Sequence, residues 1–289
     1  MIAVLDKLTG EIPTWHLSEG LVLRPMTKQL WEAADAAGVT VGLEPILRLR
    51  TCAAIVGDYP GNSNKDMVGF HDMVRVVKAL RLCGLTSLGL ATILNLGDGI
   101  QYEDMDEGDD WCQHMPVRRG VPLLERPSMS LSCSFDGIEV GAVSEVIHQL
   151  QAVGHQLEVG VRRFMLACSR DDVDDSLIDC SIVLESTILS DVRQELSYRL
   201  AVRAALLLSE QRNPQETREL VARIYKWRSK AVHDGILLNT KLNGVEMMDF
   251  EDAMFDLTRE VLLIYLKAVA LGNSVKSVNE ALDLRAISG

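Results

Sequence analysis

Apolar residues recur with a helical spacing from residue 138 onward, and this repeat is what most limits the fold of the chain. In the segment IEVGAVSEVIHQLQAVGHQLEVGVRRFMLAC, residues 138–168, they fall close to every 3.6 positions, as one face of an α-helix requires. A single helix of this length would measure about 45 Å. Gly154 and Gly160 each weaken it by up to about 1 kcal/mol, which favours a kink.

Four further amphipathic helices are expected after this one. They span residues 176–189, 192–210, 213–234 and 250–271. Asp175 or Ser176 is the expected N-cap of the first of them. The helix at 213–234 has the clearest start signal, because Asn213 is a candidate N-cap, Pro214 is at N1 and Glu216 at N3 completes a capping-box pattern. Gly235 is placed to end it. Five such helices with short links predict an antiparallel bundle over residues 138–289.

The N-terminal part, residues 1–137, reads as an α+β domain of unknown role. Short apolar runs between turn signals predict strands, and one helical repeat ends at Gly84. The expected strands are residues 20–25, 45–57, 87–99 and 128–135, the helix is 70–84, and a loop is expected at 58–64. The fold class is therefore an α+β N-terminal domain followed by an all-α bundle.

Composition narrows the classes of function. The net charge of −12 argues against a protein that coats nucleic acid by bulk electrostatics, so any nucleic-acid site must be a local basic patch. The start of the chain does not resemble a signal peptide, and the most apolar run, residues 261–271, is too short to span a membrane. We therefore expect a cytoplasmic protein without a membrane partner.

Metal and cofactor sites are not expected from the spacing of the usual ligands. The six cysteines include no CxxC pair, and Cys112 with His114 lacks a second pair of ligands. The acidic run YEDMDEGDD, residues 102–110, is interpreted as a solvated loop; a divalent-cation loop is the alternative, although the ligand spacing of a calcium loop is absent. The N-terminal half contains no phosphate-binding loop and no dinucleotide motif after a predicted strand.

The segment YKWRSKAVHDG, residues 225–235, is the strongest candidate site. Arg228 and His233 are five positions apart, so in an ideal helix their directions differ by about 140°. They can converge only if the helix ends or tightens near His233. The expected apolar stripe consists of Leu220, Ile224, Trp227 and Ala231, with Arg228 and Lys230 off it. For this segment alone, a solvated cation and an ordinary histidine at a helix end are the simplest interpretation.

Three segments of the C-terminal half, the last of which contains this motif, follow one another in a characteristic order. They are VRRFMLACSRDDVDDSLIDCSIVLESTIL (161–189), ELSYRLAVRAALLL (195–208) and ARIYKWRSKAVHDG (222–235). Over about residues 140–265 the chain resembles the Apea-like branch of the HEPN superfamily. That branch shows an Arg-Phe segment, an acidic stretch, L-I-D-x-x-I-x-L-E, a helix with Arg and Ala pairs, and Y-x-x-R-S-x-x-V-H-x-G.

The resemblance implies a helical bundle that usually dimerises and acts as a metal-independent endoribonuclease without a cofactor. Its Arg-x4–6-His motif falls on Arg228 and His233 as catalytic residues. Many nucleolytic members carry Asn, Asp or His directly after the arginine, where this chain has Ser229. The branch often has serine there. Lys226, Ser229 and Lys230 are the expected RNA-binding residues.

Asp179 and Glu185 match the acidic positions of the family's L-I-D-x-x-I-x-L-E segment. They are interpreted either as supporting residues of the site or as buried partners of Arg163 or of helix ends. Trp227 is assigned to the core rather than to base stacking.

RNA cleavage fits this pair of residues chemically. RNA carries its own nucleophile in the 2′-OH, histidine can move the protons, and a guanidinium can hold the charged transition state. The expected partners are RNA, such as tRNA or another structured RNA, a second copy of the chain or a higher oligomer, and a regulatory protein. The expected setting is antiviral defence or a stress response. The alternative hypothesis is a non-catalytic HEPN module that binds a nucleotide, RNA or a protein partner.

Overall fold

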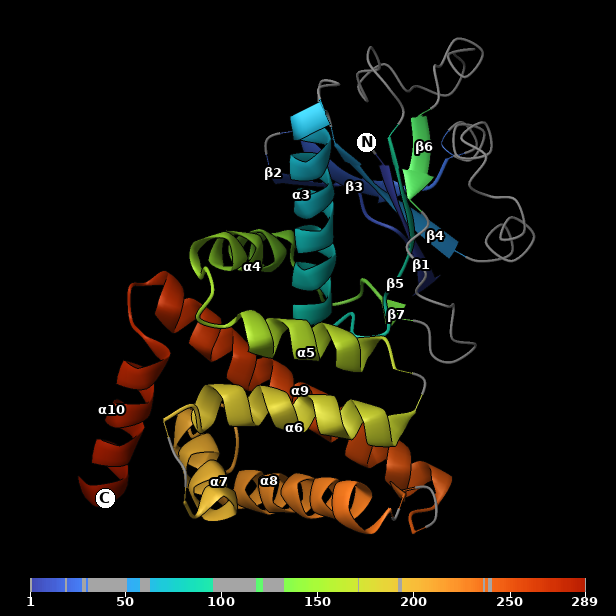
Figure 1. Ribbon diagram of the computed structural model, residues 1–289. Helices are drawn as coiled ribbons and strands as arrows, with labels where there is room; N and C mark the ends of the chain where they lie inside the picture. Colours follow the sequence, from blue (N-terminus) through green and yellow to red (C-terminus); the bar gives the residue numbers. More distant parts are fainter. Residues whose placement is uncertain are drawn as a thin grey trace. The chain divides into compact units, whose positions relative to one another are not determined.

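The protein has a mixed α+β fold with a helical majority (Figure 1). The computed structural model describes residues 2–18, 20–27, 30, 51–57, 63–95, 118–121, 133–170, 172–191, 194–235, 237–238 and 241–288. The chain divides into two compact units, residues 1–147 and 148–289. The division falls inside helix α4 (Val140–Ala152), ten residues after the boundary placed from the sequence.

The first unit is built on a mostly antiparallel sheet with the strand order β2-β3-β4-β1-β5-β6; β7 pairs with β1 in parallel. Its elements are β1 (Ile2–Thr9), β2 (Trp15–Ser18), β3 (Leu21–Pro25), β4 (Thr51–Gly57), α3 (Ser63–Leu82), β5 (Gly89–Asn95), β6 (Arg118–Val121) and β7 (Cys133–Ser134). Residues 2–5 of β1 and 52–56 of β4 are buried without alternation, which is typical of strands covered on both faces. Strands β1, β2 and β6 were not predicted from the sequence.

Helix α3 packs against β4 and β5. It begins at Ser63, seven residues before the predicted start, and the chain turns at Gly84 with a φ of 117°. The buried Arg81 side chain donates to the Leu88 carbonyl from Nε (3.1 Å) and Nη2 (2.8 Å), which ties the helix end to the start of β5. The acidic run 102–110, Cys112, His114 and the predicted strand residues 45–50 and 128–132 lie outside the described residues.

The described part of the second unit is a bundle of helices, as predicted. It differs from the expected helices in the division of the first helix and in an additional helix, α10. Figure 1 shows α5, α6 and α8 stacked side by side, with α9 crossing behind them. The helices are α5 (Glu158–Cys168), α6 (Val173–Ile188), α7 (Leu196–Leu207), α8 (Pro214–Ser229), α9 (Gly244–Ala270) and α10 (Val275–Ser288), with a π-helical turn η3 (Lys230–Asp234) after α8. Helix α10, which packs against α7 and α9, was not predicted.

The single long helix predicted over residues 138–168 is wrong. Helix α4 ends at Ala152 and α5 begins at Glu158, because Gly154 adopts a φ of 58° that interrupts the helix. Gly160 has a different role. A methyl group there would lie 3.4 Å from both Leu262 Cδ1 and Thr187 Cγ2, so glycine allows α5 to approach α6 and α9 closely.

The N-cap and the terminal glycine of α8 agree with the sequence, whereas the described hydrogen bonds do not include the return bond from Glu216 that a capping box requires, and the N-cap of α6 differs. The Asn213 side chain accepts hydrogen bonds from the backbone of Gln215 and Glu216, and Gly235 adopts a φ of 63°. The N-cap of α6 is Asp172 rather than Asp175 or Ser176; it accepts from the Asp174 amide at 2.8 Å. A full capping box forms instead at α9, between Asn243 and Glu246.

A buried polar network joins four of the helices. Arg203 of α7, whose side chain is 2% exposed, forms ion pairs with Asp191 after α6 (2.8 Å) and Asp283 of α10 (2.7 Å). Its Nη1 also donates to the Ile188 carbonyl at 2.6 Å. Asn279 of α10 donates to Asp191 and accepts from the Tyr265 hydroxyl of α9. The network therefore holds α10 against the rest of the bundle.

Candidate functional site

Arg228 lies on the buried face of α8, which corrects the expectation from the sequence. The buried residues of this helix are Thr217, Val221 and Ile224, and Arg228 continues their i, i+4, i+7, i+11 spacing. Of the predicted apolar stripe, Ile224 is buried, whereas Leu220, Trp227 and Ala231 are only half-buried. The polar end of Arg228 is therefore positioned by the core.

The guanidinium of Arg228 has a sparse set of partners. The side chain is 25% exposed, and its Nη2 lies 3.7 Å from Glu185 Oε1 of α6. The two groups form an ion pair, but they are too far apart for a hydrogen bond. Its Nε is buried and has no hydrogen-bond partner in the described part of the chain. Leaving a buried donor unpaired costs free energy. The long distance to Glu185 leaves the guanidinium group only weakly engaged, so it can still bind an anion.

The turn that carries His233 is a π-helical turn. The amide of Gly235 donates to the Lys230 carbonyl five residues earlier, where an α-helix would bond four residues earlier. The helix widens here instead of tightening. Because a wider turn has more residues per turn, the direction of His233 moves back toward that of Arg228, away from the 140° of an ideal helix. Such turns occur frequently at functional sites.

His233 itself is exposed at the end of this turn. Of the expected RNA-binding residues, Lys226 is exposed, whereas Ser229 and Lys230 are half-buried. The Lys230 ammonium lies 4.6 Å from the centre of the Trp227 ring, so part of its charge is already engaged in a cation–π contact. The imidazole of His233 is therefore exposed to solvent, whereas Arg228, five residues earlier, is partly buried.

Residues on one face of helix α6 contact the chain at Arg228 and at Leu238, on the two sides of His233. Glu185 pairs with Arg228, and eleven residues earlier the buried Asp174 accepts the amide of Leu238 on both carboxylate oxygens, at 3.0 and 3.2 Å. Positions 174 and 185 share a face because eleven residues are about three turns. Burial raises the pKa of Asp174, and the bond from Leu238 opposes this.

We expect Asp174→Ala to lower the free energy of unfolding by about 1–3 kcal/mol at pH 7, because the buried Leu238 amide loses its acceptor. Asp174→Asn keeps one acceptor and is the matched control. Since the folded-state pKa is raised, ionised Asp174 is unfavourable in the folded protein. The free energy of unfolding of the Asp174→Asn variant, relative to that of the wild type, should therefore be greatest at neutral pH. This difference should decline as the pH falls through the raised pKa of Asp174. Urea denaturation at several pH values measures both effects; a pH-independent difference would contradict the second.

Asp179 does not lie in contact with Arg228 or His233 in any described interaction. It is buried, with a side chain 1% exposed, and accepts from Arg163 Nη1 at 2.8 Å and Arg170 Nε at 2.9 Å. The alternative that Asp179 is a buried partner of Arg163 is therefore what the structure shows, with Arg170 as a second partner. The bond to Asp179 raises the pKa of Arg170.

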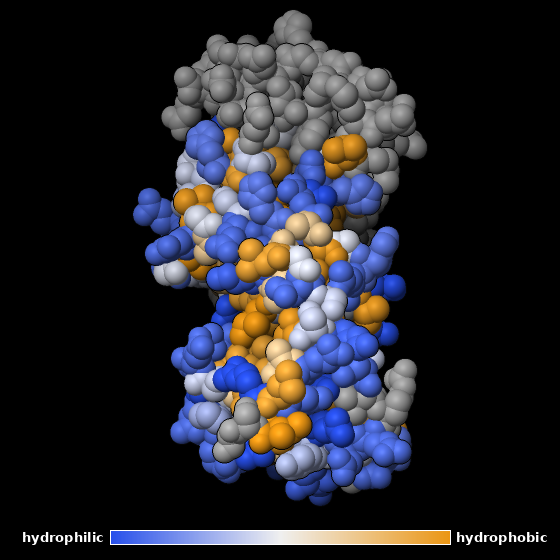
Figure 2. Space-filling view, turned by 90° about the vertical axis from the view of Figure 1, so that its left-hand side faces the viewer, coloured by the Kyte–Doolittle hydropathy of each residue, from blue (hydrophilic) through white to orange (hydrophobic). Residues whose placement is uncertain are grey.

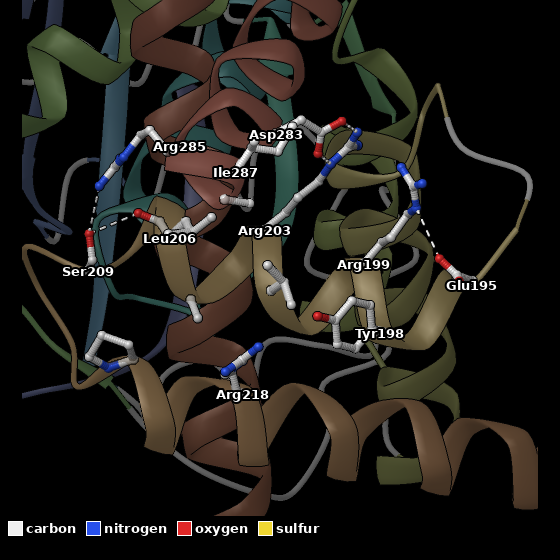
Figure 3. A pocket seen from close by; sticks show the side chains of 14 residues that line it. Glu195, Tyr198, Arg199, Arg203, Leu206, Ser209, Arg218, Asp283, Arg285 and Ile287 are labelled. Carbon is white, nitrogen blue, oxygen red and sulfur yellow. Dashed lines mark hydrogen bonds and ion pairs between the residues drawn. The ribbon is translucent and has the colours of Figure 1, made fainter. Parts of the chain in front are cut away.

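Two features of the bundle were not recognised in the sequence. Val232 and Leu237, on either side of His233, are 48% and 40% exposed. A second feature is a pocket of about 600 Å³ beside α7, at the other end of α8 (Figure 3). Neither the exposure of single apolar residues nor the approach of three helices to one pocket can be predicted from the spacing of residues within one segment.

Within the described ranges, no group of three or more His, Cys, Asp or Glu side chains could hold a metal ion. No single described helix is long and apolar enough to cross a membrane; α9 and α10 pass such a test only as a pair, and that pair is bent by 114°. Comparisons with protein-family models, curated proteins and solved structures found no match to the chain.

Proposed function

We propose that the protein is a metal-independent endoribonuclease in which Arg228 and His233 act on the scissile phosphate of RNA. The observation that carries this proposal is the π-helical turn between the two residues, which favours their convergence at the end of α8. The resemblance to the Apea-like HEPN branch supplies the same pair. The proposed setting is the cytoplasm, in antiviral defence or a stress response.

The two side chains have complementary chemical roles in this proposal. The 2′-OH of the RNA attacks the adjacent phosphorus and the bond to the 5′ oxygen breaks, which leaves a 2′,3′-cyclic phosphate and a 5′-OH. His233 transfers protons, since imidazole titrates near neutral pH. Arg228, whose side chain is 25% exposed, stabilises the negative charge that develops on the phosphoryl oxygens. The ion pair with Glu185, at 3.7 Å, is long enough to be exchanged for a phosphate.

One histidine cannot readily serve both ends of an in-line displacement, so the proposal includes a homodimer that brings two motifs together. The exposed Val232 and Leu237 support this, because apolar side chains beside a polar site gain free energy when a second copy covers them. In such a dimer, one His233 removes the 2′-OH proton and the other protonates the leaving oxygen.

We expect the protein to be a dimer at micromolar concentration and Val232→Asp to shift it to the monomer, because a buried, unpaired carboxylate strongly opposes association. Val159→Asp is the matched control, since Val159 is 55% exposed on α5 and lies outside the motif. Light scattering coupled to size-exclusion chromatography measures the mass of each. A wild-type monomer, or equal behaviour of the two variants, would contradict a dimer interface at the motif.

A non-catalytic binding module is the second candidate. It is favoured by the Arg228–Glu185 ion pair, which already engages the arginine, and by the exposed apolar residues, which equally suit a regulatory protein partner. Measuring RNA cleavage by the wild-type protein and by its His233→Ala variant separates the two functions.

A further inference from the structure

A pocket in the bundle gathers four arginines from three helices. It has a volume of about 600 Å³ and lies between α7, the start of α8 and the end of α10. Arg199 and Arg203 come from α7, Arg218 from α8 and Arg285 from α10, and the lining also includes two carboxylates. In a chain of net charge −12, this concentration of guanidinium groups is a local exception.

The arginines differ in how strongly they are already paired. Arg203 is held between Asp191 and Asp283. Arg199 lies 3.8 Å from Glu195 in an exposed pair, which contributes little free energy. Arg285 donates to the Ser209 hydroxyl at 3.2 Å. Arg218 is exposed and forms no ion pair with any described residue, and Figure 3 shows it reaching from α8 toward α7.

The same pocket has apolar and aromatic surface. Val202 and Leu206 line it, and Tyr198 and Ile287 are 64% and 84% exposed beside them. Figure 2 shows apolar residues gathered on the face of the bundle where the last turns of α10 lie; Leu284, 69% exposed, belongs to those turns. A pocket that combines guanidinium groups with apolar side chains and an exposed aromatic ring suits a ligand that carries both an anionic group and an apolar ring.

We propose that this pocket binds a small phosphate monoester that carries a flat, largely apolar ring. Guanidinium groups from different helices can bind separate oxygens of a phosphate dianion, and Arg218 is the principal one. The ring stacks on Tyr198 and contacts Ile287. A volume of about 600 Å³ exceeds what phosphate alone requires and lies within the usual range of ligand pockets. Arg218 and His233 are fifteen residues apart, about 22 Å along a helix, so this site does not depend on the proposed RNA cleavage.

The test is calorimetric titration of the full chain with AMP, phenyl phosphate, adenosine and inorganic phosphate. We expect the two ring-bearing phosphates to bind more tightly than adenosine or inorganic phosphate. Arg218→Gln should raise their Kd about ten-fold or more, as expected for loss of a charge-assisted bond. Tyr198→Ala should raise the Kd of AMP and leave the Kd of inorganic phosphate unchanged. Lys276→Gln is the matched control, because it removes one exposed charge from α10 outside the pocket lining.

The same chemistry occurs in a free nucleotide and at the 5′ end of a nucleic-acid strand. A 5′-phosphorylated tetradeoxynucleotide, which lacks the 2′-OH and so resists the proposed cleavage, distinguishes these sources when compared with its 5′-hydroxyl form and with AMP. Tighter binding of AMP supports a free ligand, and tighter binding of the phosphorylated strand supports a strand end. Absence of saturable binding by every phosphate, equal Kd values for inorganic phosphate and AMP, or insensitivity to Arg218→Gln would overturn the proposal.

Discussion

His233→Ala is expected to reduce RNA cleavage by about 10²–10⁴-fold, the usual contribution of a general acid or base. The side chain is exposed in the π-helical turn and the described interactions give it no partner in the core, so the fold should be retained. Cleavage by the wild-type protein should continue in excess EDTA and leave 2′,3′-cyclic phosphate and 5′-OH ends. An oligonucleotide with a 2′-deoxy sugar at the scissile position should bind but resist cleavage, because it lacks the nucleophile.

His155→Ala is the matched control for this experiment. His155 is another exposed histidine of the bundle, with a side chain 98% exposed and paired with Glu158, but it lies outside the motif. Its substitution should leave the cleavage rate unchanged. Loss of activity in EDTA, or 5′-phosphate ends, would show that the proposed mechanism is wrong. Absence of any cleavage together with RNA binding that survives His233→Ala would favour the non-catalytic module.

Arg228→Ala is a less decisive variant than the sequence suggested. The arginine continues the buried face of α8, so its removal also takes packing from the core and leaves Glu185 without its partner. A loss of activity in that variant could result from lost catalysis or from lower stability. In His233→Ala the fold should be retained, so a loss of activity there reports on catalysis.

The double substitution Asp191→Asn, Asp283→Asn is expected to lower the free energy of unfolding by about 3–5 kcal/mol. Both replacements keep the size of the side chain but leave the Arg203 guanidinium, 2% exposed, without a counter-charge. Arg203 lowers the pKa of both carboxyl groups, chiefly through its hydrogen bonds. Because these folded-state pKa values are lowered, the stabilisation is present above the ordinary aspartate pKa of about 4 and is lost as the pH falls through the lowered values.

Urea denaturation followed by circular dichroism measures this loss. Glu195→Gln is the matched control, because it breaks an exposed 3.8 Å pair with Arg199 and should change stability by less than about 1 kcal/mol. Adding Arg203→Met to the double variant should recover part of the loss, since it removes the stranded cation. Equal stabilities of the double variant and the wild type would show that the network does not hold α10 in place.

Local signals in the sequence were sufficient for much of the bundle. Asn213, Pro214 and Gly235 mark the ends of α8 and its π-helical extension through backbone geometry that depends on neighbouring residues only. The break at Gly154 has a local cause, so the sequence could indicate it. The apolar periodicity alone could not show whether the helix kinks there or ends. Strand β1 was missed because residues 2–5 form a short apolar run, which carries no alternation when both faces are covered.

The sequence by itself determined the helical repeat from residue 138, the order of the motifs, and the identity of Arg228 and His233 as the candidate pair. Only the tertiary structure decided which face of α8 is buried, since that depends on where α6 and α9 lie. It also decided that the helix widens at Lys230–Asp234, that Asp179 pairs with Arg163 and Arg170, and that Arg218 enters a pocket. The buried face of α8, the ion pairs of Asp179 and the pocket depend on contacts between different segments, about which the spacing of residues within one segment carries no information. The wider turn is a local hydrogen bond from Gly235 to Lys230, which the apolar spacing does not distinguish from an ordinary helix end.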